Sequence, residues 1–109
     1  MIIVKNSQLN NETLSALDKL TEVDINATVA FKLARIIREI TSIVEDKNKM
    51  ERRIKEKYSG DLDNSEYLSE MKDLGNVENE IGYDRINFEE LNLKTAKVKD
   101  LIRLEFLFN

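Results

Sequence analysis

Residues 28–58 form the longest uninterrupted helical pattern in the chain and constrain its fold more than any other segment. They contain no glycine and no proline, and apolar residues recur there at steps of three and four. This ladder consists of Leu33, Ile36, Ile40, Ile43, Met50 and Ile54, with Lys47 as its one polar interruption. The helix would be roughly 46 Å long, whereas an average helix has about 11–12 residues. A chain of 109 residues built on it should be a single domain, mostly α within an α+β fold.

A second helix is predicted from Glu66 to about Glu78, after a helix end at Ser59–Gly60 and a polar turn over residues 61–65. Gly60 allows the left-handed conformation that ends many helices, and Ser65 is the predicted N-cap of the second helix. Its apolar residues again fall at helical steps, and they are Tyr67, Leu68, Met71, Leu74 and Ile81. Two helices with apolar stripes and a short connection indicate a long antiparallel hairpin.

The segments outside the hairpin predict a small two-stranded β element and a C-terminal helix. Residues 1–5 are rich in β-branched side chains and should pair with a bulged strand over residues 81–88. Short helices are expected over residues 10–20 and 95–108. Two strands alone are marginally stable, so these helices must cover them.

Asparagine and threonine side chains mark where two of the predicted helices begin. The helix over residues 10–20 can be capped by Asn10 or Asn11. Residues 23–27 alternate between apolar and polar and should be extended. The long helix then begins at Thr28 or, as the alternative cap, at Asn26.

Charge is divided unevenly along the predicted hairpin. Residues 32–57 contain nine basic and five acidic side chains, and residues 61–90 contain ten acidic and two basic. We expect the basic Lys49, Arg52, Arg53, Lys55 and Lys57 to form exposed ion pairs with the opposite arm. The acidic side chains concerned are Asp61, Asp63, Glu66, Glu70 and Asp73. The alternative is that these acids form a free surface that imitates a nucleic-acid backbone.

The residue types present exclude several kinds of chemistry. The chain has no histidine and no cysteine, so the usual nucleophile triads and zinc ligand sets are absent. Residues 61–65 imitate the start of an EF-hand loop, but Glu66 and Lys72 stand where that loop needs glycine and glutamate. We therefore expect a polar turn, no metal and no cofactor, and a metal-dependent nuclease lacks a convincing ligand set.

Net charge and hydropathy limit the partners. The formal charge of −4 and the absence of an aromatic stacking platform beside the basic cluster disfavour nucleic acid. No apolar run approaches 18 residues, so no membrane span is expected. The first five residues are too short for a signal peptide, and the absence of cysteine agrees with a cytoplasmic protein.

The apolar ladder of residues 33–54 is longer than the second helix can cover, since about 13 residues span about 20 Å. This predicts a homo-oligomer or a larger protein partner on that face. Lys47 would either set the register of paired helices or reach out of the interface to solvent. Phe106 and Phe108 are either core residues or anchors for a partner. The candidate partner-binding residues are therefore Ile36, Ile40, Lys47, Met50, Phe106 and Phe108.

Several short runs give the chain a resemblance to a known group. They are the Leu-Asp-Lys-Leu of residues 17–20, the Ala-Phe-Lys-Leu-Ala-Arg-Ile-Ile of residues 30–37 and the Lys-Glu-Lys-Tyr of residues 55–58. With the acidic middle, residues 86–93 and the apolar last helix, they resemble an uncharacterised family of small proteins. That family is encoded by tailed phages and prophages of low-GC bacteria. The resemblance implies a phage gene product with no known activity.

We therefore expect a non-enzymatic phage protein that binds another protein, as a virion component or an assembly factor. It would act in the host cell cytoplasm or in the virion. The alternative is an inhibitor of a host defence enzyme that uses the acidic surface, either anti-CRISPR-like or as a nucleic-acid mimic. One feature distinguishes the two hypotheses. Mimicry needs acidic side chains that are unpaired and face one way.

Overall fold

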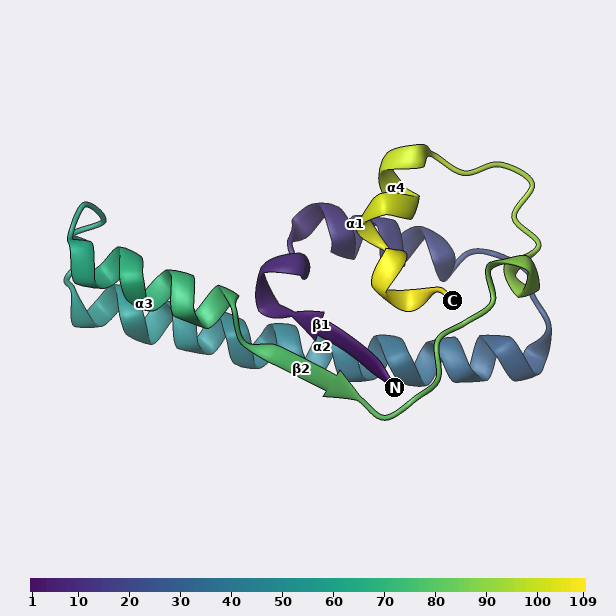
Figure 1. The fold of residues 1–109 in the computed structure, drawn as a ribbon, viewed down its shortest axis with the longest axis horizontal. Helices are drawn as coiled ribbons and strands as arrows, with labels where there is room; N and C mark the ends of the chain where they lie inside the picture. Colours follow the sequence, from purple (N-terminus) through teal and green to yellow (C-terminus); the bar gives the residue numbers. More distant parts are fainter.

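The computed structural model describes residues 1–109, and Figure 1 shows a body with a long helical arm projecting from it. The elements in chain order are β1 (Ile2–Lys5), the 3-10 helix η1 (Asn6–Gln8), α1 (Asn11–Leu20), α2 (Ala27–Lys57), α3 (Ser65–Gly75), β2 (Glu78–Ile81), the 3-10 helix η2 (Phe88–Leu91), α4 (Val98–Arg103) and the 3-10 helix η3 (Glu105–Leu107). The expected α+β fold is confirmed, with its long helix, its two-stranded antiparallel sheet and its C-terminal helix.

The long helix α2 extends over 31 residues, nearly as predicted. Its N-cap is Asn26, whose side-chain oxygen accepts a hydrogen bond of 2.9 Å from the backbone N–H of Thr28. The alternative cap was therefore the right one, and Thr28 lies inside the helix. At the other end, Ser59 and Gly60 both have positive φ, of 51° and 78°, and the chain leaves the helix there. Gly60 suits such a position because it has no Cβ.

Helix α3 packs antiparallel to the second half of α2 and forms the predicted hairpin (Figure 1). Asn64 is its N-cap and accepts hydrogen bonds from the backbone N–H groups of Glu66 and Tyr67. The prediction that Ser65 caps this helix was wrong, because Ser65 is already its first residue. The helix ends at Gly75, three residues before the predicted end, because residues 78–81 pair with β1 instead.

Strand β2 lies opposite β1 with Ile2 paired to Ile81 and Lys5 paired to Glu78. The prediction that residues 1–5 pair with a second strand is confirmed, but that strand covers residues 78–81 and not the predicted residues 81–88. The reason is that β2 contains one apolar residue, Ile81. Its other position on the core-facing side, opposite Val4, is occupied by Asn79. The Asn79 amide donates to the Val4 carbonyl at 3.1 Å and to the Asn6 side chain at 2.8 Å. A polar side chain at this position hides the alternation that marks a strand.

The C-terminal segment is more irregular than predicted. The prediction of one helix over residues 95–108 was wrong, because α4 covers six residues and is followed by η3. The turn between them lets Phe106 and Leu107 enter the core, and the backbone of Ile86 pairs with this segment. Ile86 donates to Leu107 at 2.9 Å and accepts from Asn109 at 3.1 Å. Residues 23–26 form an irregular link without strand pairing, and Ala27 is the first residue of α2.

The core lies between the first half of α2 and the elements stacked on it. Alternate residues of β1 point into this core, where Ile2 and Val4 are buried while Ile3 is exposed. The buried cluster is contributed by β1, α1, α2, β2 and the C-terminal third of the chain. Its members are Ile2, Val4, Leu9, Ala16, Leu17, Leu20, Leu33, Ile36, Ile40, Ile81, Ile86, Leu91, Leu104, Phe106 and Leu107. On α2 the cluster ends at Ile40, so the rest of that helix extends beyond it.

Candidate functional site

The hairpin arm, residues 44–75, carries its own small apolar contact separate from the main core. Its two buried side chains are Ile54 on α2 and Tyr67 on α3, and Met71 and Leu74 are half-buried beside them. Leu68 was predicted to face α2, but it is 55 % exposed, so that prediction was wrong. Ile40 was also assigned to this contact, yet it belongs to the body core. The arm is therefore held together by few buried residues.

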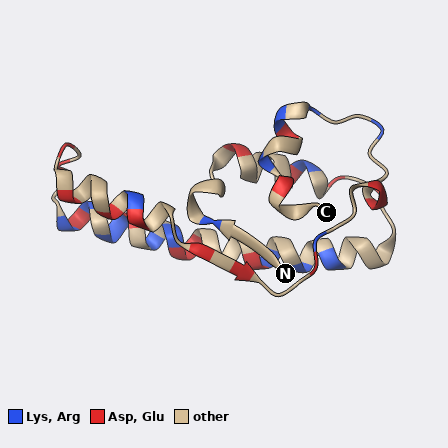
Figure 2. Ribbon diagram, viewed as in Figure 1, with Lys and Arg blue, Asp and Glu red and all other residues tan.

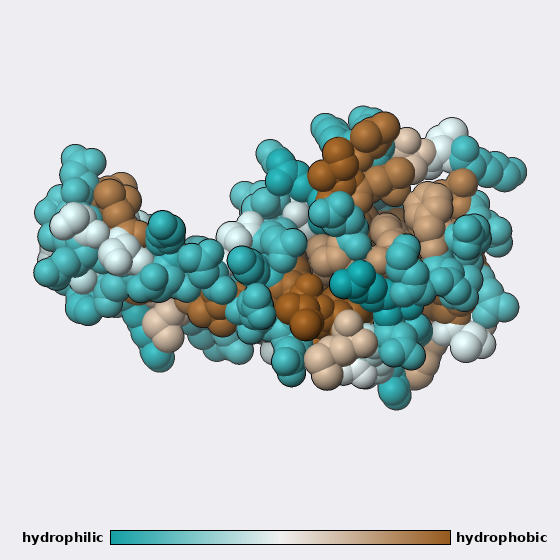
Figure 3. All heavy atoms as spheres, viewed as in Figure 1, coloured by the Kyte–Doolittle hydropathy of each residue, from teal (hydrophilic) through white to brown (hydrophobic).

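The arm tip, residues 58–68, joins the two helices of the arm. Tyr58 and Tyr67 meet edge to face there, with ring centroids 6.0 Å apart. Leu62 in the turn and Leu68 in the first turns of α3 are both more than half exposed. Figure 3 shows a brown, hydrophobic area near the free end of the arm. Two exposed leucines on a narrow projection form a candidate contact for another protein.

One ion pair crosses the arm next to the tip. The ammonium of Lys57 donates to a carboxylate oxygen of Glu70 at 2.9 Å, while the other oxygen, Oε2, is buried without a hydrogen-bond partner. The hydrogen bond with Lys57 lowers the pKa of Glu70, and the same bond raises the pKa of Lys57. Desolvation, followed by the nearby Glu70 carboxylate, raises the pKa of Tyr58. The arrangement fixes the start of the tip relative to α3.

The other expected pairs across the hairpin do not form. Lys49, Arg52, Arg53 and Lys55 are exposed and have no ion-pair partner. On the opposite side the same holds for Asp61, Asp63, Glu66 and Asp73. The prediction of extensive pairing was therefore wrong for all but Lys57 and Glu70. Figure 2 shows the blue and red residues interspersed along the arm.

The structure divides the predicted partner-binding residues into two groups. Ile36, Ile40 and Phe106 are buried in the core of the chain itself, which removes them from any partner surface. Phe108 is half-buried and packs edge to face on Phe88, with ring centroids 5.4 Å apart. Met50 remains on the arm surface, 42 % exposed. The body and α3 cover most of the α2 ladder, so the uncovered stripe from which self-association was predicted is absent.

Lys47 lies where the arm leaves the body. It shares a shallow hollow with Asn6, Ile43, Leu74 and Asn79. Its side chain is mostly buried, and its ammonium lies 3.5 Å from Glu51, one turn along the same helix. Lys47 therefore does not reach out to solvent, as one alternative expected, but stays in the hollow and meets Glu51.

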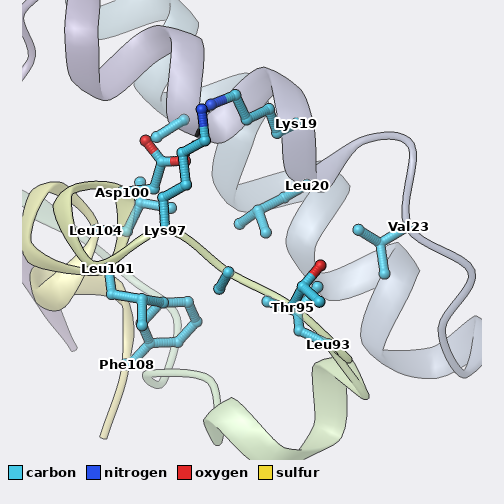
Figure 4. A pocket seen from close by; sticks show the side chains of 12 residues that line it. Lys19, Leu20, Val23, Leu93, Thr95, Lys97, Asp100, Leu101, Leu104 and Phe108 are labelled. Atoms are coloured by element: carbon cyan, nitrogen blue, oxygen red, sulfur yellow. Dashed lines mark hydrogen bonds and ion pairs between the residues drawn. The ribbon is translucent and has the colours of Figure 1, made fainter.

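A cleft of about 520 Å³ lies between α1 and residues 93–104, and the sequence reasoning did not identify it. Figure 4 shows Lys19, Lys97 and Asp100 grouped at one end of the cleft, Leu101 and Phe108 on one side of it and Leu93 beside Thr95 on the other. The cleft is mainly apolar, and it is lined by Ala16, Lys19, Leu20, Val23, Leu93, Thr95, Ala96, Lys97, Asp100, Leu101, Leu104 and Phe108.

Two ion pairs join α4 to α1 beside this cleft. Lys19 lies 3.0 Å from Asp100, and Arg103 pairs with Glu12. The outer face of α4 carries Val98 and Ile102, which are 72 % and 61 % exposed and form a brown area over α4 in Figure 3. Both were expected inside a longer helix. The one sequence feature that could have indicated their exposure is the number of lysines in this segment, which is typical of a surface and not of a core.

The acidic side chains do not assemble a metal site. No three carboxylates come close enough together to hold an ion, at the turn over residues 61–65 or elsewhere. Helix α2, despite its length, is too polar to cross a membrane, and the other helices are too short. Comparisons of the chain with protein families, with curated protein sequences and with solved structures find no match.

Proposed function

We propose that the protein acts without catalysis, by binding another protein through the hairpin arm. The observation that supports this is that the arm contributes little to the main core. The buried cluster ends on α2 at Ile40, and beyond residue 44 the arm buries only Ile54 and Tyr67. Ordering a backbone costs about 1–2 kcal/mol per residue, which so little burial offsets poorly. A contact with another protein would explain why the chain has an arm that buries so little of its own surface.

The chemistry of the arm tip indicates how that contact would form. Leu62 and Leu68 offer apolar surface to a hollow on a partner, and Asp61, Asp63 and Glu66 surround them with negative charge. Apolar anchors within a charged rim are typical of specific protein contacts. The sequence resemblance adds the context, namely a virion component or an assembly factor of a phage.

The test is site-specific photo-cross-linking in the cells that naturally express the protein. A benzophenone amino acid replaces Leu68 in one variant and Ser42 in the matched control, which is exposed on the body half of α2. We expect cross-linked protein from position 68 and little from position 42. Equal yields from both positions, or none from position 68, would contradict the proposal.

A second candidate is inhibition of a nucleic-acid enzyme through the acidic surface. It is favoured by the exposed, unpaired state of Asp61, Asp63, Glu66 and Asp73. The two candidates differ in which substitutions abolish capture of the partner. Mimicry requires the charges, so D61N/D63N/E66Q should abolish cross-linking from position 68 and L62S should leave most of it. Binding through the tip predicts that the leucine variant loses it.

A further inference from the structure

Two exposed surfaces of this chain have opposite charge. The arm tip, residues 58–68, contains three acidic and no basic residues. The segment over the cleft, residues 93–104, which we call the cap segment, contains four basic residues and one acidic residue. This excess of positive charge stands out in a chain whose formal net charge is −4. Opposite charge on two surfaces of one molecule favours contact between copies.

The charges on both surfaces are available to a partner. Within the cap segment, Asp100 and Arg103 are paired with α1, which leaves Lys94, Lys97 and Lys99 without an ion-pair partner. At the tip, Asp61, Asp63 and Glu66 are likewise unpaired. These two sets would neutralise each other if the surfaces met.

The two surfaces also differ in shape. The tip is a narrow projection that exposes Leu62 and Leu68, and the cap segment lies over an apolar cleft beside the exposed Val98 and Ile102. The cleft volume of about 520 Å³ lies in the range of pockets that enclose apolar groups. Within one molecule these surfaces are far apart, because the tip forms one end of a particle 48 Å long and α4 lies on the body (Figure 1).

We propose that the arm tip of one copy docks in the cleft under the cap segment of a second copy, so that the molecules associate head to tail. The inference rests on the proposed function, since it names the partner of the arm. Leu62 and Leu68 enter the cleft, and the acidic residues of the tip face Lys97 and Lys99. Each docked pair keeps one free tip and one free cleft, so this contact builds open chains or rings.

The proposed contact is small, and its affinity should depend on the salt concentration. Two leucines and a few exposed charges bury less area than a standard stable interface of about 1,600 Å², so association should be weak and concentration-dependent. Added salt screens the exposed charges, with a Debye length of about 10 Å at 0.1 M and about 3 Å at 1 M. Raising the salt concentration from 0.1 M to 1 M should therefore weaken association several-fold.

The test uses two variants whose substitutions lie on exposed side chains, L62S/L68S at the tip and A96E, which places a charged side chain in the lining of the cleft. Sedimentation equilibrium up to about 1 mM should show association of the unmodified protein and monomers of 12.7 kDa for each variant alone. An equimolar mixture of the variants retains one intact tip and one intact cleft. It should form a dimer of one copy of each and no larger species.

Charge reversal provides a second, independent pair of variants. D61K/D63K and K97E/K99E should each weaken association by about tenfold or more, and mixing them should restore it. An unmodified protein that stays monomeric throughout would overturn the inference. So would a mixture that fails to form the heterodimer, or a tip or cap variant that associates fully alone. Cross-linking from position 68 to other proteins would then still support the proposed function, whereas its absence would remove both.

Discussion

The body and the arm share one helix but bury it to different extents. In the body, Leu33, Ile36 and Ile40 lie under β1, α1 and the C-terminal segment, and none is more than 3 % exposed. In the arm, the same face of α2 is covered by α3 alone, and Ile54 is its one buried side chain. An apolar ladder therefore predicts the face on which a helix packs, while the number of covering elements decides how deeply its residues are buried.

This difference has consequences for local stability. Regions with few buried apolar contacts open at lower free energy than the core of the same molecule. The arm should therefore fray before the body unfolds, even though its backbone is continuous with the body through α2.

The largest loss of stability is expected for Ile36→Ala. The side chain is 0 % exposed, and removing it leaves a cavity in the main core that should cost about 3–5 kcal/mol. Urea unfolding followed by circular dichroism measures this change. Ile37→Ala is the control, since Ile37 is half-buried on the same turn and should cost less. A loss below about 1 kcal/mol for Ile36→Ala would mean that the body is not the stable part.

Ile54→Ala should cost about 2 kcal/mol, at the low end for such substitutions, because the thin arm can collapse around the cavity. The effect should be local. Hydrogen exchange is expected to speed up for amides of residues 50–72 while those of α1 and β1 stay protected. Uniform acceleration throughout the chain would show instead that arm and body unfold together.

Asn64→Ala should destabilise the arm by about 1 kcal/mol, because it removes the side-chain oxygen that accepts from Glu66 and Tyr67. Ser65→Ala is the matched control and should change stability by less than about 0.5 kcal/mol. Thermal unfolding and exchange of the α3 amides measure both. A larger loss of stability for Ser65→Ala than for Asn64→Ala would show that Ser65 caps the helix.

Lys47→Met tests the junction between arm and body. The substitution keeps the length of an unbranched side chain and gives up the contact with Glu51, so stability should change by less than about 0.5 kcal/mol. Sedimentation equilibrium should give the same mass distribution as the unmodified protein. A changed oligomeric state would indicate that Lys47 sets helix register between copies.

The smallest effect concerns the ion pair between Lys57 and Glu70. The folded pKa of Glu70 is lowered by the hydrogen bond from Lys57, so the ionised form stabilises the arm above the unfolded pKa of Glu70. That stabilisation is lost as the pH falls through the folded pKa. The folded pKa of Lys57 is raised, so its share is present below 10.5 and is lost as the pH rises through the folded value.

Melting temperatures of the unmodified protein and of Glu70→Gln, measured from neutral to acidic pH, test this pair. The melting temperature of the unmodified protein should exceed that of Glu70→Gln at neutral pH, and this difference should disappear in acid. An NMR titration of the Glu70 carboxyl carbon should give a midpoint below 4.5. A midpoint at or above that value would show that the pair does not form in solution.

The fold class and the hairpin could be predicted from sequence because they depend on local patterns. The spacing of Leu33, Ile36 and Ile40 indicates a helix, and Gly60 indicates its end. Strand β2 could not be placed because Asn79 occupies its inward position and is satisfied by Val4 and Asn6, which are distant in sequence. The break between α4 and η3 follows from pairing with Ile86, which is also outside the local sequence, although closer to its partner.

The surfaces were harder to predict than the fold. Whether Ile40 is exposed depends on which elements cover it, and whether Asp61 is paired depends on side-chain distances that helix spacing does not specify. Val98 and Ile102 lie in a helix as predicted, but α4 turns both side chains outward. The cleft arises between segments separated by more than 70 residues, and no local pattern encodes it.

The unbroken course of α2 makes it a rigid lever. No glycine or proline interrupts it, so there is no hinge at which the arm could swing independently of the body. From Ile40 to Lys57 the helix advances about 25 Å, so tilting it by about 10° in the core would move its far end by about 4 Å. Small changes in the packing around Ile36 are thus magnified at the arm tip, and the body determines where the tip points.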